Sequence, residues 1–397
     1  MSAHLATAAP RRNAMPSRIA SGPGHARDAL TSWLLGDRAQ VTSGTHAGAA
    51  AGWVDREGRA SYVYPEITGY YLQWLAWHAA CHGVNDETRR RAAAAQRWLL
   101  SWAFGAETPE TRVYLEPAGQ DWRNAALFFF DLAMVLRGLA STARLGLIEA
   151  DPRLVARVSE LLSRLVADDG MFDACVATRV DAALPDRWST RRGPFLSKAA
   201  GGVLIAAAQF SSLPGALAEA ADATFGAALE SMSAQSHSET HALLYGIEGA
   251  LSRPEHPATV AAMPHMVRQL RDLIERSAPL GYTPELLGRS GRVRLDIVAQ
   301  AIRVAAFLLP ELSNELSNEL SNELSNELSA DLPTKHLDQM AEVLVHYIDP
   351  NLGIPFSPDA PPHEYNVWTA MFAEQALFAV ECGPNDARLA ELRLCLV

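Results

Sequence analysis

A carboxylate stands at the start of a strongly aromatic segment, residues 61–80, SYVYPEITGYYLQWLAWHAA. Pro65 is suited to the first position of a helix, and Glu66 would then occupy the second, where a carboxylate stabilises the helix dipole. The neighbouring aromatic side chains, among them Tyr64 and Tyr70, also suit a carboxylate that takes part in acid–base chemistry. We therefore treat Glu66 as a candidate catalytic residue, with the dipole interaction as the alternative role.

Further polar and aromatic residues stand just before, or near the start of, other apolar segments. The candidates for catalysis are, with Glu66, the residues Asp121, His241 and Glu364. The candidates for substrate binding are Trp53, Tyr64, Tyr70, Trp122, Arg123, His237, Tyr245, Arg292, Asn366 and Trp368. Aromatic faces stack on the C–H surfaces of sugars, and polar groups bind sugar hydroxyls. The arginines indicate a substrate that carries carboxylate, sulfate or phosphate, so the pattern predicts a site for an acidic sugar or oligosaccharide.

Three kinds of function fit these residues. Hydrolysis of a glycosidic bond needs two carboxyl groups, one of them protonated, and Glu66, Asp121 and Glu364 are the candidates. A uronate-type lyase or C5-epimerase instead needs a base next to the substrate carboxylate and a group that neutralises this carboxylate. His241 or Tyr245 would be the base, and Asn366 or Arg123 the neutralising group. The third function is non-catalytic binding of a glycan or another small molecule, and the sequence leaves all three open.

No metal or cofactor is predicted. His237 and His241 are one helical turn apart, but a metalloprotease helix needs Glu directly after the first histidine, and Ser238 is there instead. Asp131 and Glu248 lie inside apolar segments, where an unpaired charge is costly. We expect each of them to form a buried structural ion pair, Asp131 with an arginine of a neighbouring segment.

The segments that follow the candidate residues are apolar nearly all round, which is typical of helices buried on all sides. They start near residues 66, 123, 197, 239, 294 and 365. Amphipathic segments separate them, at 26–36, 86–103, 152–168, 214–232, 257–277 and 335–348. This alternation predicts an all-α (α/α)6 toroid, with an inner ring of helices inside an outer ring. The inner helices of such a toroid run in the same direction, so their N-termini gather at one opening and bring the candidate residues together.

A single toroid domain is expected over residues 26–397, after a flexible leader at 1–25. Residues 311–331 do not fit the alternation of helices, because they repeat ELSN every four residues. Leucines four residues apart drift by about 40° per repeat around a helix and give no narrow stripe for a partner. We interpret this segment as a surface insertion, helical or partly disordered, without a functional role.

The composition narrows the classes of partner. The net charge of −11 argues against nucleic acid as a partner. Six of the negative charges lie in residues 311–331, so the rest of the chain is only mildly acidic. The leader lacks the apolar run of a secretory signal, and no segment is long and apolar enough to span a membrane. The four cysteines are far apart and follow no disulfide or zinc spacing, which favours a cytoplasmic protein. The oligomeric state is left open.

Four segments resemble proteins of the six-hairpin glycosidase-like superfamily: YPEITGYYLQWL, FDLAMVLRGL, ETHALLYGIEGAL and YNVWTAMFAEQAL. The resemblance spans most of residues 50–382 and is to bacterial members associated with surface-polysaccharide genes. It implies the (α/α)6 toroid fold and an activity on carbohydrate. The superfamily includes glycoside hydrolases, and related toroids serve polysaccharide lyases and uronyl C5-epimerases. The resemblance therefore implies one fold and leaves several reactions open.

Overall fold

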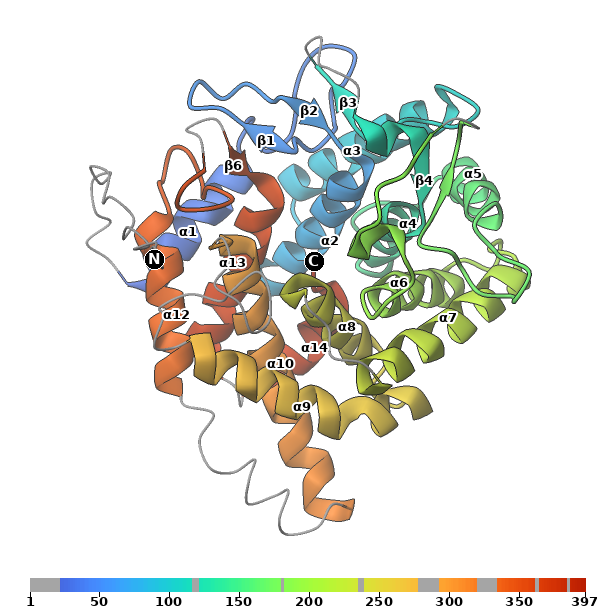
Figure 1. The fold of residues 1–397 in the computed structure, drawn as a ribbon. Coiled ribbons are helices and arrows are strands. Elements are labelled where there is room, and N and C mark those ends of the chain that lie inside the picture. Colours follow the sequence, from blue (N-terminus) through green and yellow to red (C-terminus); the bar gives the residue numbers. More distant parts are fainter. Residues whose placement is uncertain are drawn as a thin grey trace, which may run out of the picture.

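The computed structural model describes residues 22–115, 121–179, 182–234, 239–277, 293–319, 334–360, 364–383 and 386–397. In this part of the chain, the helices form two concentric rings (Figure 1). The inner ring consists of α2 (Pro65–His82), α4 (Phe129–Arg144), α6 (Leu196–Gln209), α8 (Thr240–Ser252), α10 (Leu295–Glu319) and α13 (Val367–Cys382). The outer ring consists of α1 (Pro23–Leu34), α3 (Asp86–Phe104), α5 (Pro152–Ser163), α7 (Gly215–Ala234), α9 (Pro257–Ser277) and α12 (Thr334–Tyr347).

Contacts between neighbouring helices close the inner ring. Helix α2 packs on α4, α4 on α6, α6 on α8, α8 on α10 and α10 on α13, and α13 in turn contacts α2. The outer helices pack against this ring, α1 on α13, α3 on α2, α5 on α4, α7 on α6, and α9 and α12 on α10. The all-α (α/α)6 toroid predicted from the sequence is therefore confirmed.

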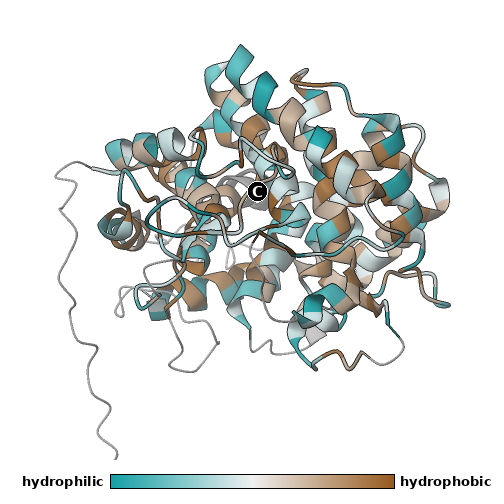
Figure 2. Cartoon of the chain, turned by 90° about the horizontal axis from the view of Figure 1, so that it is seen from above, coloured by the Kyte–Doolittle hydropathy of each residue, from teal (hydrophilic) through white to brown (hydrophobic). Residues whose placement is uncertain are grey.

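Burial follows the two patterns seen in the sequence. Every residue of α2 from Ile67 to Ala79 is buried, as the absence of a polar face requires. Helix α5 buries one stripe that includes Leu154, Val158 and Leu161, while its other face is polar. Hydrophobic and hydrophilic residues alternate along the peripheral helices in Figure 2. The core therefore lies between the two rings and inside the inner one.

Short antiparallel strand pairs join the loops that lead into several inner helices (Figure 1). Strand β1 (Trp53–Val54) pairs with β6 (Tyr365–Asn366), β2 (Tyr62–Val63) with β3 (Val113–Tyr114), and β4 (Ala126–Phe128) with β5 (Cys175–Ala177). A 3-10 turn, η1 (Trp122–Ala125), precedes β4, and another, η2 (Trp188–Thr190), precedes α6. These pairs fix the loops before α2, α4 and α13 to one another, at the end of the ring where the inner helices begin.

At the other end of the ring, the chain turns back after α13. Helix α14 (Ala387–Leu392) and the 3-10 turn η4 (Arg393–Cys395) lead inward, and Leu396 and Val397 are buried. The turn η4 contacts both α2 and α8, and Figure 1 shows the C-terminal label inside the inner ring. The last residues therefore fill the ring from the end opposite the short strands.

Helix α10 continues through Glu319, so the first part of the ELSN repeat is helical and prolongs an inner helix. Figure 1 shows this end of α10 extending beyond the ring. Residues 320–331 of the repeat, and most of the expected leader, lie outside the described residues; helix α1 already begins at Pro23. Among the described helices, none has the length and apolar character needed to cross a membrane.

Candidate active site

Two carboxyl groups meet at the start of neighbouring inner helices. Glu66 is the second residue of α2, and Asp131 is the third residue of α4. The Tyr64 hydroxyl donates a hydrogen bond to Asp131 Oδ1 at 3.3 Å, and the Glu66 carboxyl lies within hydrogen-bonding reach of Tyr64 and Asp131. Asp131 Oδ2 accepts no hydrogen bond from the described residues, and a proton shared with Glu66 would satisfy this buried oxygen.

Burial and mutual contact keep this Glu66–Asp131 pair partly protonated. Burial raises the pKa of Glu66, and the hydrogen bond from Tyr64 offsets only part of the effect. Burial and the adjacent Glu66 charge together raise the pKa of Asp131 well above its usual value. Two carboxylates in contact cannot both ionise at low cost, so the pair favours the state in which the two groups share one proton. The expected arginine partner of Asp131 was wrong, since its partners are a tyrosine and a glutamate.

Asp121 lies before η1 and has the opposite protonation state. Its side chain accepts hydrogen bonds from Arg112 Nη1 at 3.3 Å, from the Tyr114 hydroxyl at 3.1 Å and from Arg123 Nη1 at 3.1 Å. It also caps η1 by accepting a bond from the Arg123 backbone N–H. Partial burial alone would raise the pKa of Asp121, but the Arg123 hydrogen bonds and the two arginine charges hold it below its usual value. Asp121 is therefore a fixed, ionised carboxylate.

Arg112 connects Asp121 to the Glu66–Asp131 pair. Its guanidinium lies 4.7 Å from the ring centroid of Tyr62 and 5.7 Å from that of Tyr64, in cation–π contact with both. Its charge also favours the ionised form of Glu66. The pairing of β2 with β3 produces this arrangement, because it brings the loop before β3 against the loop before α2.

His241, near the start of α8, is neutral and held in one orientation. Burial and the charge of Arg294 lower the pKa of His241 to about 4. Its Nδ1 is 2.8 Å from Gln300 Oε1, and Gln300 Nε2 donates to Glu248 Oε2 at 3.1 Å, which fixes the amide orientation. Because the Gln300 oxygen can only accept, Nδ1 carries the ring proton and Nε2 keeps a lone pair. His241 is thus set up to accept a proton or a hydrogen bond at Nε2.

Glu248 anchors this arrangement from inside the ring. Its Oε2 accepts from Lys198 Nζ at 2.7 Å, and its Oε1 accepts from Arg303. All three side chains are almost completely buried. Burial would raise the pKa of Glu248, but the charges of Arg303 and Lys198 lower it below its usual value. The predicted buried structural ion pair of Glu248 is observed.

The Lys198 ammonium lies under two of the predicted binding residues. It is 4.8 Å from the ring centroid of Tyr70 and 4.5 Å from that of Tyr245. The Tyr245 ring in turn lies 4.2 Å from the His241 ring, centroid to centroid. Burial lowers the pKa of Lys198 to about 7, because Glu248 offsets only part of the desolvation. Tyr70 and Tyr245 are both buried, so they form the base of the site rather than its rim.

The start of α13 contributes a capped helix end and Trp368, and the paired strand β1 adds Trp53. Asn366 Oδ1 accepts from the backbone N–H of Thr369 at 2.9 Å, so Asn366 is the N-cap of α13. Trp368 Nε1 donates to Asp296 Oδ2 at 3.3 Å. Trp53 is paired with Asn366 in the register of β1 and β6. Asn366 therefore has a structural role, although its Nδ2 is buried without a partner among the described residues.

The other candidates are placed as follows. Trp122 carries the guanidinium of Arg123 over its ring at 4.7 Å, and Arg187 lies 5.9 Å from the same ring. Glu364 is half-buried, and its backbone carbonyl accepts from Phe356 N–H. His237 and Arg292 lie outside the described residues. The described candidates all belong to the end of the ring where the inner helices begin.

Sequence reasoning missed three contributors to this end of the ring. Arg112 directly precedes the two-residue strand β3 and Tyr114 ends it, in a segment whose local sequence has no regular pattern, and only the strand pairing brings them to Asp121. Asp131 was assigned a structural role, although it stands in the first turn of an inner helix, as Glu66 does. This shared position in the first helical turn was the sequence feature that could have identified Asp131 as a site residue.

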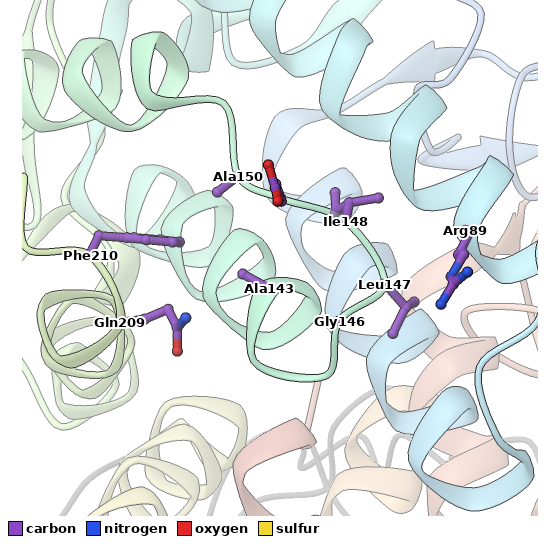
Figure 3. A pocket seen from close by; sticks show the side chains of 9 residues that line it. Arg89, Ala143, Gly146, Leu147, Ile148, Ala150, Gln209 and Phe210 are labelled. Carbon is purple, nitrogen blue, oxygen red and sulfur yellow. The ribbon is translucent and has the colours of Figure 1, made fainter.

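Among the described residues, no group of three or more His, Cys, Asp or Glu side chains is placed to hold a metal ion. A shallow cavity of about 680 Å³ lies at the opposite end of the ring (Figure 3). It is lined by Arg89 of α3, by Gly146 and Ile148 after α4, and by Gln209 and Phe210 at the end of α6. None of the candidate residues lines it.

No family model matches the sequence, and no curated protein matches it either. Solved structures do match the fold. A sugar epimerase from a ruminal bacterium has a TM-score of 0.61 at 11% identity, covering 90% of this chain and 98% of that chain. The shared fold is the (α/α)6 toroid.

Two other similar structures extend this comparison. The glucoamylase of Saccharomycopsis fibuligera has a TM-score of 0.60 at 10% identity, over 90% of this chain and 94% of that chain. The unsaturated glucuronyl hydrolase of Bacillus sp. GL1 has a TM-score of 0.59 at 14% identity, over 91% of this chain and 98% of that chain. At such identities the likeness shows the (α/α)6 toroid fold alone, and the chemistry has to be argued from the residues.

Proposed function

We propose that this chain is a carbohydrate-active enzyme of the glycoside hydrolase type, in which the Glu66–Asp131 pair is the general acid. The observation that carries this proposal is the contact between the two carboxyl groups at the start of α2 and α4, with the pKa of both raised. A carboxyl group that keeps its proton at neutral pH can protonate the leaving oxygen of a sugar.

Asp121 is the second carboxylate in this proposal. A glycosidase needs one protonated and one ionised carboxyl group, and their environments must push the two pKa values apart. Burial and contact raise the pKa of the Glu66–Asp131 pair, whereas two arginines keep Asp121 ionised. Glu66 and Asp131 cannot themselves be the two flanking groups, because their carboxyl groups are in contact and leave no room for a glycosidic bond.

The substrate that we propose is acidic. Arg112 and Arg123 share the carboxylate of Asp121, and the guanidinium of Arg187 lies beside the Trp122 ring, so guanidinium groups are concentrated at this part of the site and favour an anionic group. Tyr62 and Trp122 offer aromatic surfaces next to these arginines. One structural neighbour is an unsaturated glucuronyl hydrolase responsible for the degradation of glycosaminoglycan. An oligosaccharide that carries a carboxylate fits this combination of aromatic faces and guanidinium groups.

A second candidate function is sugar epimerisation or elimination, in which a base removes a proton from carbon. The neutral state of His241, with a lone pair at Nε2, favours this reaction class. Structural neighbours include a cellobiose 2-epimerase and a D-mannose isomerase. In this reaction the Glu66–Asp131 pair would return the proton or stabilise the intermediate, and His241 would be the base.

We also propose a cellular setting for this protein. The four cysteines are all free thiols, which supports a reducing compartment such as the cytoplasm. The resemblance to polysaccharide-associated bacterial proteins supports a role in the metabolism of a cell-surface polysaccharide.

The test is product analysis on neutral and acidic oligosaccharides. We expect a new reducing end without ultraviolet absorbance, and the loss of this product in Glu66→Gln and Asp131→Asn. An unsaturated, absorbing product, or an epimer detected by NMR and abolished by His241→Gln, would replace hydrolysis with the second candidate. Saturable binding of a sugar without turnover would exclude both enzymatic functions and leave a binding protein.

A further inference from the structure

Two successive residues of the loop before α6 contact different sides of the candidate site. The Arg187 guanidinium lies 5.9 Å from the ring centroid of Trp122, which begins η1. The Trp188 ring lies 5.9 Å from the ring of His241 in α8, centroid to centroid. This loop therefore connects the arginine-rich side of the site, around Asp121, to the neutral histidine.

Hydrogen bonds hold the loop in place. Near its end, Arg192 Nε donates to Asp173 Oδ1 at 3.0 Å, which attaches the loop to the segment before β5. The Thr190 hydroxyl donates to the carbonyl oxygen of Pro185 at 2.7 Å and accepts from the Arg187 N–H at 3.2 Å. The backbone that carries the two site residues is thus fixed by the protein itself, which lowers the cost of ordering it around a ligand.

Arg187 differs from the other two arginines of this loop. Arg191 pairs with Asp186 at 3.0 Å, and Arg192 pairs with two aspartates. Within the described part of the chain, no carboxylate forms an ion pair with Arg187, and its side chain is exposed. The N–H groups of a guanidinium form a planar fork that matches a carboxylate or a sulfate group. Arg187 can therefore be reached from solvent by an anionic ligand at the edge of Trp122.

Trp188 presents an aromatic surface next to His241. Its ring is nearly perpendicular to that of the buried Phe195, with the centroids 5.1 Å apart, and nearly perpendicular to the His241 ring. These two contacts hold the plane of the indole, and the side chain is only half-buried. An exposed part of an indole stacks on the C–H surface of a sugar. A sugar that binds there lies beside the histidine.

We propose that Arg187 and Trp188 form a substrate-binding subsite that selects an oligosaccharide with a carboxylate or sulfate group. Trp188 stacks on a sugar ring beside His241, and Arg187 binds the anionic group beside Trp122. The inference rests on the proposed function, because it concerns the same acidic substrate, and it assigns the selectivity for charge to Arg187. Both residues act on binding, and neither takes part in bond cleavage.

The role of Arg187 is tested with trigalacturonate, its methyl ester and sulfated maltotriose, by calorimetric binding or, where a probe is turned over, by its KM. The methyl ester keeps the sugar skeleton without the charge. Arg187→Met should weaken binding of the acidic probes by about 3–10-fold and leave binding of the ester unchanged. Arg187→Lys keeps the charge without the fork and should recover part of the loss. Arg191→Met removes the same charge from the same loop and should bind like the wild type.

The role of Trp188 is tested with the same probes. Trp188→Leu should weaken binding of the acidic probes and of the ester equally, by about 3–10-fold, because stacking does not depend on charge. Trp188→Phe keeps an aromatic face and should retain most of the affinity. The melting temperatures of the two variants show whether each is folded, and the Phe variant carries the test if the Leu variant is not.

The possible outcomes separate this subsite from the proposed reaction. Binding of an acidic probe that depends on Arg187 and Trp188, without turnover, supports the subsite and contradicts hydrolysis. Turnover with the same KM in Arg187→Met and the wild type refutes the subsite and leaves hydrolysis intact. Equal losses in Arg187→Met and Arg191→Met, or no binding of any of the three probes to the wild type, also refute the subsite.

Discussion

At the scale of single residues, the ionisable groups of the candidate site are held in different states by the donors around them. The Glu66–Asp131 pair is surrounded by a tyrosine hydroxyl and by its own second carboxyl group, and it keeps a proton. Asp121 is bound by two arginines and is ionised. His241 donates to an amide oxygen and is neutral. An acid and potential bases are thus present together at neutral pH, which is the requirement for acid–base catalysis.

Glu66→Gln separates a catalytic role from a dipole interaction. The glutamine amide can donate to Asp131 in place of the shared proton, so we expect the melting temperature to stay level or to rise. Activity should fall by about 10²–10⁴-fold, because the proton donor is lost. A carboxylate that only stabilises the α2 dipole would instead cost about 0.3–1 kcal/mol on removal and leave activity unchanged. Calorimetry and rate measurements decide this, with the exposed Glu230→Gln of α7 as the control.

Tyr64→Phe tests how the Tyr64 hydroxyl affects the pKa values of the Glu66–Asp131 pair. The Tyr64 hydroxyl stabilises the ionised form of both carboxyl groups and so lowers their pKa values. Its removal should raise the pKa of the pair, so the protonated acid persists to higher pH. We expect the alkaline limb of the pH–rate profile to move upward by roughly 0.5–1 pH unit. The matched change Tyr114→Phe removes a bond to Asp121 and should leave that limb in place. An unmoved or lowered alkaline limb in Tyr64→Phe would mean that another group is the acid.

At the scale of elements, the position of the pair depends on how closely α2 and α4 approach. Gly69 of α2 faces the α4 backbone, and a Cβ there would lie 2.5 Å from the Met134 carbonyl oxygen. Only a glycine permits this spacing, which brings the starts of the two helices, and hence Glu66 and Asp131, into contact.

Gly69→Ala should therefore force α2 and α4 apart. We expect a loss of about 1–3 kcal/mol in the free energy of unfolding, together with reduced activity, because the pair is separated. Gly226→Ala, in the interior of α7, meets nothing within 4 Å and should stabilise by about 0.5–1 kcal/mol. Urea denaturation of both variants makes the comparison. Equal stability of the two variants would show that the α2–α4 interface can relax.

A second inter-element contact gives a pH-dependent stability. Glu374 of α13 accepts from Trp74 Nε1 of α2 at 3.1 Å and lies 3.5 Å from the Thr31 hydroxyl of α1. Burial raises the pKa of Glu374 from 4.5 to about 7. The folded state therefore binds the extra proton, and this contribution is fully present below pH 4.5 and is lost as the pH rises through 7.

Glu374→Gln should remove that contribution, because the amide does not titrate. Between about pH 4.5 and pH 7.5, the free energy of unfolding of the wild type should fall by on the order of 3 kcal/mol relative to that of the variant. Unfolding by urea at several pH values measures the difference, which isolates Glu374 from other titrating groups. Glu230→Gln again serves as the surface control. Parallel curves for the wild type and Glu374→Gln would mean that Glu374 is ionised in the fold.

At the scale of the whole molecule, the fold was predictable because it follows from helix periodicity alone. A helix such as α2, apolar on every side, has to be enclosed, and a helix such as α5, with one apolar stripe, has to lie outside it. The strand pairs were not predictable, because each has only two or three residues and joins segments far apart in the chain. Short strands carry too little periodicity to be recognised.

The candidate site was predictable only in outline. The sequence placed Glu66, Asp121 and His241 at one end of the ring, because each stands near the start of an inner helix. Their partners depend on tertiary contacts that no local pattern encodes: Asp131 meets Glu66 across two helices, and Arg112 meets Asp121 through the β2–β3 pairing. Protonation states follow from those partners, so they too required the structure.

The ELSN repeat poses the remaining question about the molecule as a whole. The inner-ring part of α10 is buried from Leu295 to Leu308, and the helix then extends beyond the ring (Figure 1). Deleting residues 313–328 removes four whole repeats and leaves this buried part intact. If the repeat is the surface insertion that we interpret from the sequence, its shortening changes loop entropy by less than about 1 kcal/mol, so we expect the melting temperature to stay within roughly 2 °C and activity to be retained. Leu308→Ala, inside the ring, should by contrast lower the free energy of unfolding by about 2–5 kcal/mol. Calorimetry and light scattering of both variants provide the test. A large fall in melting temperature on deletion, or the loss of an oligomer, would show that the repeat is an interface.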